Sequence, residues 1–95
     1  MASDFKILIH ENNTNLHLKL MGDFDGSSAY ELINALKTYS SRVKRVFIHS
    51  SGLKTVDPFG KTVFHDHFNE VNKTDKSFVF TGENGNSLNP VISDH

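Results

Sequence analysis

The chain has 95 residues, with ten Lys and Arg against eleven Asp and Glu, a formal net charge of -1 and no cysteine. This length predicts one small domain, residues 1–95, with a single core of two layers. The absence of cysteine excludes disulfides, cysteine-ligated zinc and thiol nucleophiles. The balanced charge disfavours nucleic acid as a partner, because neutralising phosphates needs a basic excess.

Alternating apolar residues predict two strands near the start of the chain. Apolar side chains occupy every second position within Phe5–His10 and again within Leu16–Met21, which is the period of a half-buried strand. The polar segment Glu11–Asn15 between them is rich in residues that form turns. Together these three segments predict a hairpin.

A helix is expected next, because the period of the apolar residues changes. Ser28 followed by Glu31 matches a capping box, which predicts where the helix begins. The apolar stripe of this helix is formed by Ala29, Leu32, Ile33, Leu36 and Tyr39.

A third strand is predicted at Val46–Ile48, where the residues are apolar on both faces. Such a run is typical of a buried strand that lies centrally and parallel to its neighbours. The segment that follows, His49–Val56, contains two serines and a glycine and is predicted to be a loop.

A second helix is expected to begin at Asp57 and Pro58, which supply an N-cap residue and a proline in the first turn. Its buried stripe is predicted to contain Gly60, Val63, Phe64, His67, Phe68 and Val71. Within this stripe His67 is interpreted as a residue at the edge of the core.

The chain is expected to end in a fourth strand at Ser77–Thr81 and a polar tail at 82–95. At most a short helical turn should dock in this tail, beginning at Asn89–Pro90. Its apolar contacts would come from Leu88, Val91 and Ile92. The predicted core of the whole domain includes Leu18, Leu20, Leu32, Ile33, Leu36, Phe47, Phe64 and Phe68.

The element order β-β-α-β-α-β predicts an α/β domain with a mixed four-stranded sheet and helices packed mainly on one face. In such a sheet, binding residues gather in the loops that leave the parallel strands. One loop carries Asp23, Asp25, Gly26 and Ser27, and the other carries Ser50, Ser51, Lys54, Thr55, Asp57, Pro58, Phe59 and Gly60.

These loops carry a resemblance to a known family. The pattern Leu18-x-Leu20-x-Gly22-Asp23-Phe24-Asp25 before a helix resembles the G-E-L-D signature of STAS domains, the anti-sigma factor antagonist family. The segment from Leu53 to Gly60 resembles that family's strand, loop and helix entrance. The resemblance covers about residues 5–81 and implies a STAS-like fold and a regulatory, non-catalytic role without a cofactor.

The family's regulatory hydroxyl is missing from this sequence. STAS proteins of this kind carry a phosphorylatable Ser or Thr directly before a glycine, and the matching residue here is Phe59. The preceding Ser of the family is replaced by Pro58. Phosphorylation at the matching position is therefore excluded, and the nearest hydroxyls on the same predicted loop are Ser50, Ser51 and Thr55.

Phe59 allows two interpretations. An exposed aromatic ring at the start of a helix would anchor a protein contact, whereas a ring folded under the loop would belong to the core. Asp57 is interpreted as a helix cap rather than as an active carboxylate.

The predicted partner-binding residues are Asp25, Lys54, Thr55, Asp57, Pro58 and Phe59. By resemblance, the partner would be an anti-sigma factor or a related switch kinase, the regulatory face of a membrane transporter, or another STAS chain. Two alternatives stay open: a STAS domain that binds a small ligand or nucleotide, and a small hydrolase. The hydrolase would use His49 and Ser50 or Ser51 with Asp25 or Asp57.

Metal binding and membrane insertion are both disfavoured by the sequence. His65 and His67 are two residues apart on a predicted helix, whereas a pair of ligands on a helix needs a separation of three or four. No apolar run approaches the ~20 residues that cross a bilayer. The start of the chain lacks a basic region followed by an apolar stretch, so the expected location is the cytoplasm.

Overall fold

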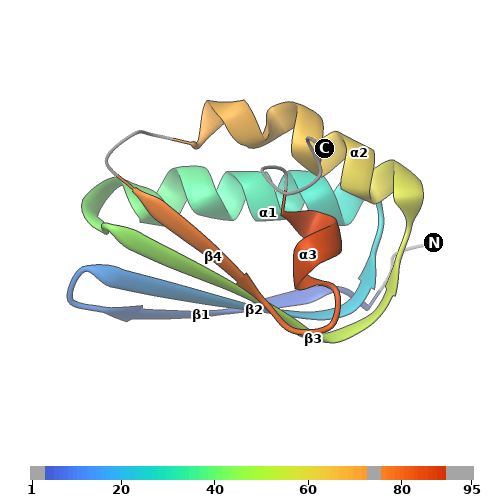
Figure 1. Ribbon diagram of the computed structural model, residues 1–95, viewed down its shortest axis with the longest axis horizontal. Coiled ribbons are helices and arrows are strands. Elements are labelled where there is room, and N and C mark those ends of the chain that lie inside the picture. The colour runs from blue at the N-terminus through green and yellow to red at the C-terminus, as the bar shows by residue number, and fades with distance from the viewer. Residues whose placement is uncertain (1–3, 73–75, 90–95) are drawn as a thin grey trace.

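The computed structural model describes residues 4–72 and 76–89 (Figure 1). The main elements follow the predicted order: β1 (Lys6–Asn12), β2 (Asn15–Phe24), α1 (Gly26–Tyr39), β3 (Arg45–Val56), α2 (Pro58–His67), β4 (Ser77–Thr81) and α3 (Gly85–Leu88). Two short 3-10 turns, η1 (Ser40–Arg42) and η2 (Phe68–Glu70), continue α1 and α2.

The four strands form one mixed sheet in the order β1-β2-β3-β4. β1 is antiparallel to β2, and β3 is parallel to both β2 and β4. Figure 1 shows α1 and α2 together on one face of this sheet. Two crossovers of the same hand that advance in the same direction across a sheet place both helices on one face. The predicted α/β class and mixed sheet are confirmed.

The hairpin between β1 and β2 is tighter than the sequence predicted. The predicted loop Glu11–Asn15 shrinks to a two-residue turn at Asn13 and Thr14, because Asn12 and Asn15 already pair across the sheet. Asn13 has a φ of 56°, a left-handed conformation that asparagine tolerates better than most residues. The second strand also extends past Met21 to Phe24.

β3 is the main correction to the predicted elements. The predicted strand Val46–Ile48 is part of a 12-residue strand, and the predicted loop His49–Val56 belongs to it. This segment stays extended because it pairs with β2 as far as the partners Phe24 and Val56, across two irregularities in register. Pairing with β2 here overrides a local sequence that favours a loop.

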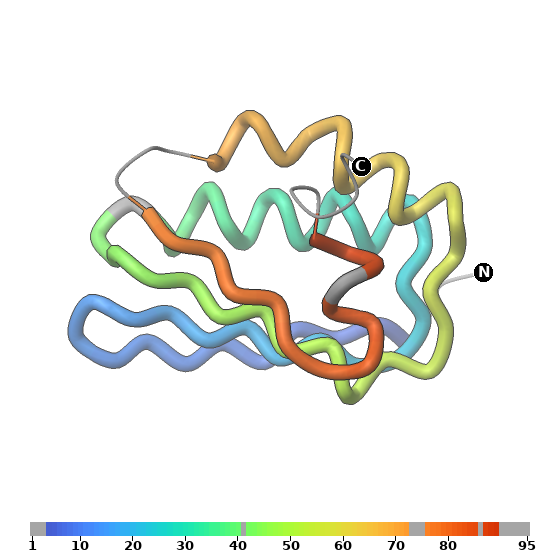
Figure 2. The backbone as a smooth tube through the Cα atoms, viewed as in Figure 1, coloured from blue at the N-terminus to red at the C-terminus, as the bar shows by residue number. Residues whose placement is uncertain are grey.

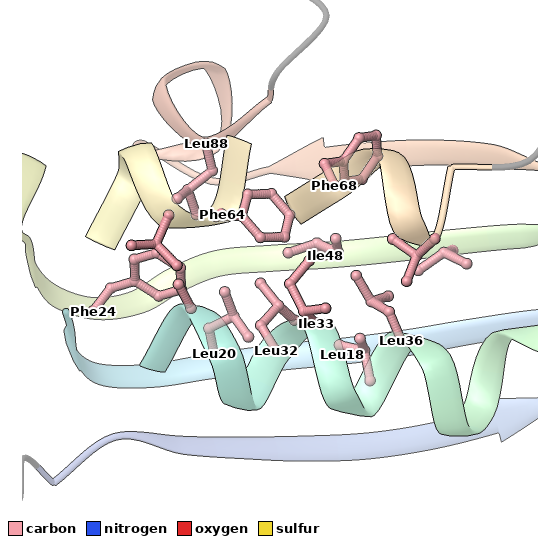
Figure 3. Close-up of a cluster of buried hydrophobic side chains, with 14 of the residues drawn as sticks. Leu18, Leu20, Phe24, Leu32, Ile33, Leu36, Ile48, Phe64, Phe68 and Leu88 are labelled. Atoms are coloured by element: carbon pink, nitrogen blue, oxygen red, sulfur yellow. The ribbon is translucent and has the colours of Figure 1, made fainter. Parts of the chain in front are cut away.

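The core lies between the helices and the sheet, and Figure 3 shows its side chains pointing toward one another from α1, α2, α3, β2 and β3. Seven of the eight predicted core residues are buried. The exception is Phe47, which is half-buried on the opposite face of the sheet. Tyr39 is exposed, so the predicted stripe of α1 loses its last residue. His67 is half-buried, as expected for a residue at the edge of the core, and Phe68 and Val71 beyond it are buried.

The tail contributes a short helix to this core. The turn predicted to begin at Asn89 begins earlier, at Gly85, and ends at Leu88, which is fully buried. The predicted contacts of Val91 and Ile92 lie outside the described residues. Among the described helices, none is long and apolar enough to cross a membrane.

Candidate functional site

The first part of the candidate site is the start of α1. Asp25 is its N-cap, and its Oδ1 accepts hydrogen bonds from the backbone N–H of Ser28 at 2.9 Å and from the hydroxyl of Ser27 at 2.8 Å. These bonds stabilise the carboxylate, with the Ser28 N–H as the largest cause, and lower the pKa of Asp25. The Asp25 side chain is therefore held in its charged form at the helix entrance.

The predicted capping box at Ser28 and Glu31 is wrong. Ser28 is the third residue of α1 and is fully buried, and its hydroxyl donates to the backbone oxygen of Asp23 at 2.9 Å. Asp25 outcompetes it as the cap because β2 ends at Phe24 and leaves Asp25 extended, which is the N-cap conformation.

The start of α2 lies beside the start of α1. The N–H of Asp57 donates to the backbone oxygen of Phe24 at 2.8 Å, which holds the ends of β2 and β3 together. Asp57 is the N-cap residue by position, as predicted, but its carboxylate makes no capping hydrogen bond. Pro58 occupies the first turn, where a missing N–H costs nothing. Both helices thus begin at the same end of the sheet (Figure 1).

Two glycines allow the two helix starts to approach closely. A Cβ added to Gly60 would lie 2.6 Å from the backbone carbon of Asp25. A Cβ added to Gly26 would lie 2.8 Å from Cε2 of Phe59. The ring of Phe59 therefore lies across the first residue of α1, and only glycine leaves room for it there.

The ring of Phe59 is exposed rather than buried in the core. Its side chain keeps 66% of its accessible surface, the largest value among the exposed large hydrophobic residues that the structure describes. Contact with Gly26 covers part of the ring and leaves the rest open to solvent. Of the two interpretations of Phe59, burial in the core is wrong.

Lys54 and Thr55 lie on the last part of β3 rather than on a loop. The hydroxyl of Thr55 donates to Oδ1 of Asp23 at 2.9 Å, which ties this part of β3 to the end of β2. Nζ of Lys54 donates to Oδ2 of Asp4 at 3.2 Å, and this hydrogen bond and charge lower the pKa of Asp4. Both side chains are exposed, and both already have a partner within the chain.

The residues of the hydrolase alternative do not come together. His49 and Ser50 are consecutive in β3, so their side chains point to opposite faces of the sheet. Ser50 is 1% exposed and its hydroxyl donates to the backbone oxygen of Thr81 at 2.7 Å. Ser50 therefore offers no accessible nucleophile and is also unsuited as a phosphate acceptor. Ser51 is exposed on the strand.

Sequence reasoning missed a histidine pair on the open face of the sheet. Nδ1 of His17 lies 3.0 Å from Nε2 of His49, whose Nδ1 lies 2.7 Å from the hydroxyl of Thr81. Burial is the largest cause that lowers the pKa of His49, followed by the charges of His17 and Lys19. The two histidines are 32 residues apart, and only the register of β2 against β3 brings them together.

The histidines of α2 have partners within the chain. His65 Nε2 lies 3.1 Å from the backbone oxygen of Leu88, and His67 Nδ1 lies 2.8 Å from Glu70. Across residues 4–72 and 76–89, no group of three His, Asp or Glu side chains is placed to hold a metal ion.

The fold is similar to that of solved anti-sigma factor antagonists. One, from Mycobacterium paratuberculosis, aligns with a TM-score of 0.65 at 13% identity, over 86% of this chain and 71% of that chain. The anti-sigma factor antagonist SpoIIAA in its unphosphorylated form aligns with a TM-score of 0.61 at 12% identity, over 82% and 69% of the two chains. The fold of the chain is therefore STAS-like.

A larger protein contains a similar unit. A crystal structure of Mglu aligns with a TM-score of 0.67 at 15% identity, over 80% of this chain and 19% of that chain. The present chain thus spans about a fifth of the length of Mglu. The sequence matches no protein-family model and no curated protein.

Proposed function

We propose that this chain is a non-catalytic STAS-like module that regulates a protein partner by docking. The docking surface comprises Asp25, Lys54, Thr55, Asp57, Pro58 and Phe59. The observation that supports this most directly is the exposed ring of Phe59 over Gly26, where two helix N-termini meet. Exposed aromatic residues at the centre of a patch are the usual anchors of protein interfaces.

The rim of this surface is polar and already ordered. Asp25 is fixed by its capping hydrogen bonds, and Thr55 is fixed by Asp23. A surface whose side chains are ordered before binding loses less conformational freedom on association. Lys54 would steer encounter with an acidic partner more than it would hold the complex together.

Phosphorylation at the family's site could not switch partner binding by this module on or off. Phosphate at a helix N-terminus adds about two negative charges at the docking surface, and neither Pro58 nor Phe59 can accept one. Ser51 and Thr55 are the exposed hydroxyls where a relocated switch could act. Of these two, Thr55 is tied to the segment that precedes α1, because its hydroxyl donates to Asp23.

The class of partner is proposed from the fold. Two similar structures are described as anti-sigma factor antagonists, which favours an anti-sigma factor or a related switch kinase in the cytoplasm. The regulatory face of a transporter and another STAS chain are the other partner classes that the resemblance implies.

Binding of a small ligand is a second candidate function, because the described residues enclose a cavity beside β4. It has a volume of about 260 Å³ and lies away from the docking surface. Its lining combines three aromatic rings with two amides and one cation: Phe68, Phe78, Phe80, Asn72, Asn89 and Lys76. The volume suits a small molecule better than a nucleotide, since drug-sized ligands occupy roughly 300–1,000 Å³.

Capture of the partner with matched variants tests the docking proposal. Wild-type chain, Phe59→Asp and Val79→Asp would be used as baits in lysate of the native cell. Val79 is the control because it is an exposed apolar residue, at 39%, on β4. The proposal expects a protein that binds the wild type and Val79→Asp but is lost with Phe59→Asp.

The fold of each bait must be checked by circular dichroism and thermal unfolding. Phe59→Asp places a negative charge at a helix N-terminus, where such a charge is favourable, so the domain should stay folded. If a captured partner binds folded Phe59→Asp as tightly as the wild type, the docking surface lies elsewhere.

A further inference from the structure

β1 forms one edge of the sheet, and its outer side pairs with none of the strands formed by residues 4–72 and 76–89. Figure 2 shows β1, in dark blue, beside β2 at the side of the sheet away from β4. Six of its seven residues are exposed, and the seventh, Ile7, is half-buried. An edge of this kind presents a row of unpaired backbone N–H and C=O groups.

The middle of β1 is apolar on both faces. Leu8 is 52% exposed on the open face, where it pairs with Lys19, and Ile9 is 41% exposed on the helix side, where it pairs with Leu18. Natural edge strands are usually protected by central charges, prolines or bulges. β1 carries its charges near its ends, at Lys6 and Glu11, and none between Ile7 and Ile9.

The geometry of the hairpin shows which backbone groups of β1 point outward. Asn12 and Asn15 flank the two-residue turn and are register partners, so they form a pair that exchanges both backbone hydrogen bonds. Such pairs alternate along an antiparallel ladder. Ile7, Ile9 and Glu11 therefore turn their backbone N–H and C=O groups away from β2, toward the free edge.

We propose that a second copy of this chain adds its own β1 to this edge, antiparallel, about a two-fold axis at Leu8. Such an axis, perpendicular to the sheet, keeps the two faces distinct, so residues directly opposite each other must share a face. With the axis at Leu8, Ile7 of one copy lies opposite Ile9 of the other. Both carry outward backbone groups, so each such pair makes two hydrogen bonds.

A second copy fits this edge because the strand is self-complementary. Leu8 meets Leu8, Ile7 meets Ile9, and Lys6 falls opposite His10, so no acidic or basic side chain faces one of the same charge while the histidine is neutral. Pairing would extend the four-stranded sheet to eight strands across the two copies. A closed two-fold dimer also leaves no β1 edge free for further growth. The inference is independent of the proposed function, because β1 contributes no residue to the docking surface.

Single cysteines test both the pairing and its register, since the natural chain contains none. Leu8→Cys, Ile9→Cys and the control Val79→Cys would be oxidised under the same conditions. In the proposed dimer residue 8 faces its own copy in a non-hydrogen-bonded pair, where the Cα atoms are about 4.5 Å apart and a disulfide can form. Residue 9 faces residue 7 instead.

The expected result is a disulfide-linked dimer of Leu8→Cys that forms at least about tenfold faster than those of the other two variants. Equal rates for all three would indicate random collision and overturn the proposal. A faster reaction of Ile9→Cys would show a shifted register and overturn the axis at Leu8.

Sedimentation of the unmodified chain provides the second measurement. Wild type and Val79→Lys should associate as their concentration rises from about 10 to 500 µM, whereas folded Leu8→Lys should need a concentration at least about tenfold higher. Wild type that stays monomeric throughout this range would overturn the proposal and leave the edge to a strand of another protein.

Discussion

Gly26 and Phe59 form a matched contact across the two helix N-termini: a Cβ at residue 26 would lie 2.8 Å from Cε2 and 3.0 Å from Cδ2 of the ring. The contact fixes where the exposed ring lies without burying it. The sequence alone could not tell whether Phe59 is a core residue or an exposed anchor for a partner. The contact answers this, because α1 holds the ring in place while the rest of the ring stays open to a partner.

Gly26→Ala should weaken partner binding while leaving the fold intact. The added methyl group displaces the Phe59 ring, whereas the first turn of a helix accepts alanine readily. The free energy of unfolding should change by less than about 1 kcal/mol, and affinity for a captured partner should fall. Isothermal titration of the wild type and Gly26→Ala against that partner checks this. An unchanged affinity would mean that the position of the ring does not matter.

Gly60→Ala should be much more harmful to stability than Gly26→Ala. The added Cβ would lie 2.6 Å from the backbone carbon of Asp25 and 2.7 Å from its backbone oxygen, and backbone cannot rotate away as a ring can. Overpacking of this kind costs roughly 1–3 kcal/mol. Urea unfolding of the two alanine variants side by side measures the difference, and equal stabilities would contradict the close approach of the helix starts.

Two phenylalanines of α2 should differ sharply when truncated. Phe64 is fully buried, so Phe64→Ala should lower the free energy of unfolding by about 3–5 kcal/mol. Phe59 is 66% exposed, so Phe59→Ala should cost less than about 1 kcal/mol. Thermal and chemical unfolding check both values. If Phe59→Ala lowered the free energy of unfolding by several kcal/mol, Phe59 would be a core residue instead.

Removal of the Asp25 cap should produce a loss of stability that depends on pH. The pKa of Asp25 is lowered in the folded chain, so its contribution is complete above the ordinary Asp pKa of about 4 and disappears as pH falls through the lowered value. Asp25→Ala should cost about 1 kcal/mol at pH 7. The difference from the wild type should shrink as pH falls below about 4, and a difference that stays constant on acidification would contradict the capping role.

His49 should make the domain less stable in mild acid. Burial lowers the pKa of His49 in the folded chain, so the unfolded chain binds a proton first. Stability from this group is therefore complete above about pH 6.5 and declines as pH falls below it. Unfolding between pH 7.5 and 5 should show a smaller decline for His49→Gln than for the wild type. His10→Gln, on the exposed strand β1, is the matched control.

The order of the elements was predictable because it depends on the spacing of apolar residues and on local helix-start residues such as proline. The stripe from Ala29 to Leu36 and the proline at 58 identify the two helices without tertiary information. The end of β3 was not predictable, since Ser50, Ser51 and Gly52 favour a loop locally and are kept extended by β2.

The candidate site was predictable in its members but not in its geometry. Asp25 and Ser28 are both good caps, and the choice between them follows from where β2 ends. Exposure of Phe59 depends on Gly26 and on the angle at which the two helix starts meet. The pairing of His17 with His49 requires a register that no local pattern encodes.

The strand order has a consequence for how the chain is made. Each strand pairs with the strand that precedes it in the chain, so the sheet can grow by one strand at a time as residues leave the ribosome. The hairpin of β1 and β2 can form first, and β3 then finds its neighbour already present. β4 arrives last and adds to the free edge of β3. No strand therefore has to be inserted between two strands that have already paired.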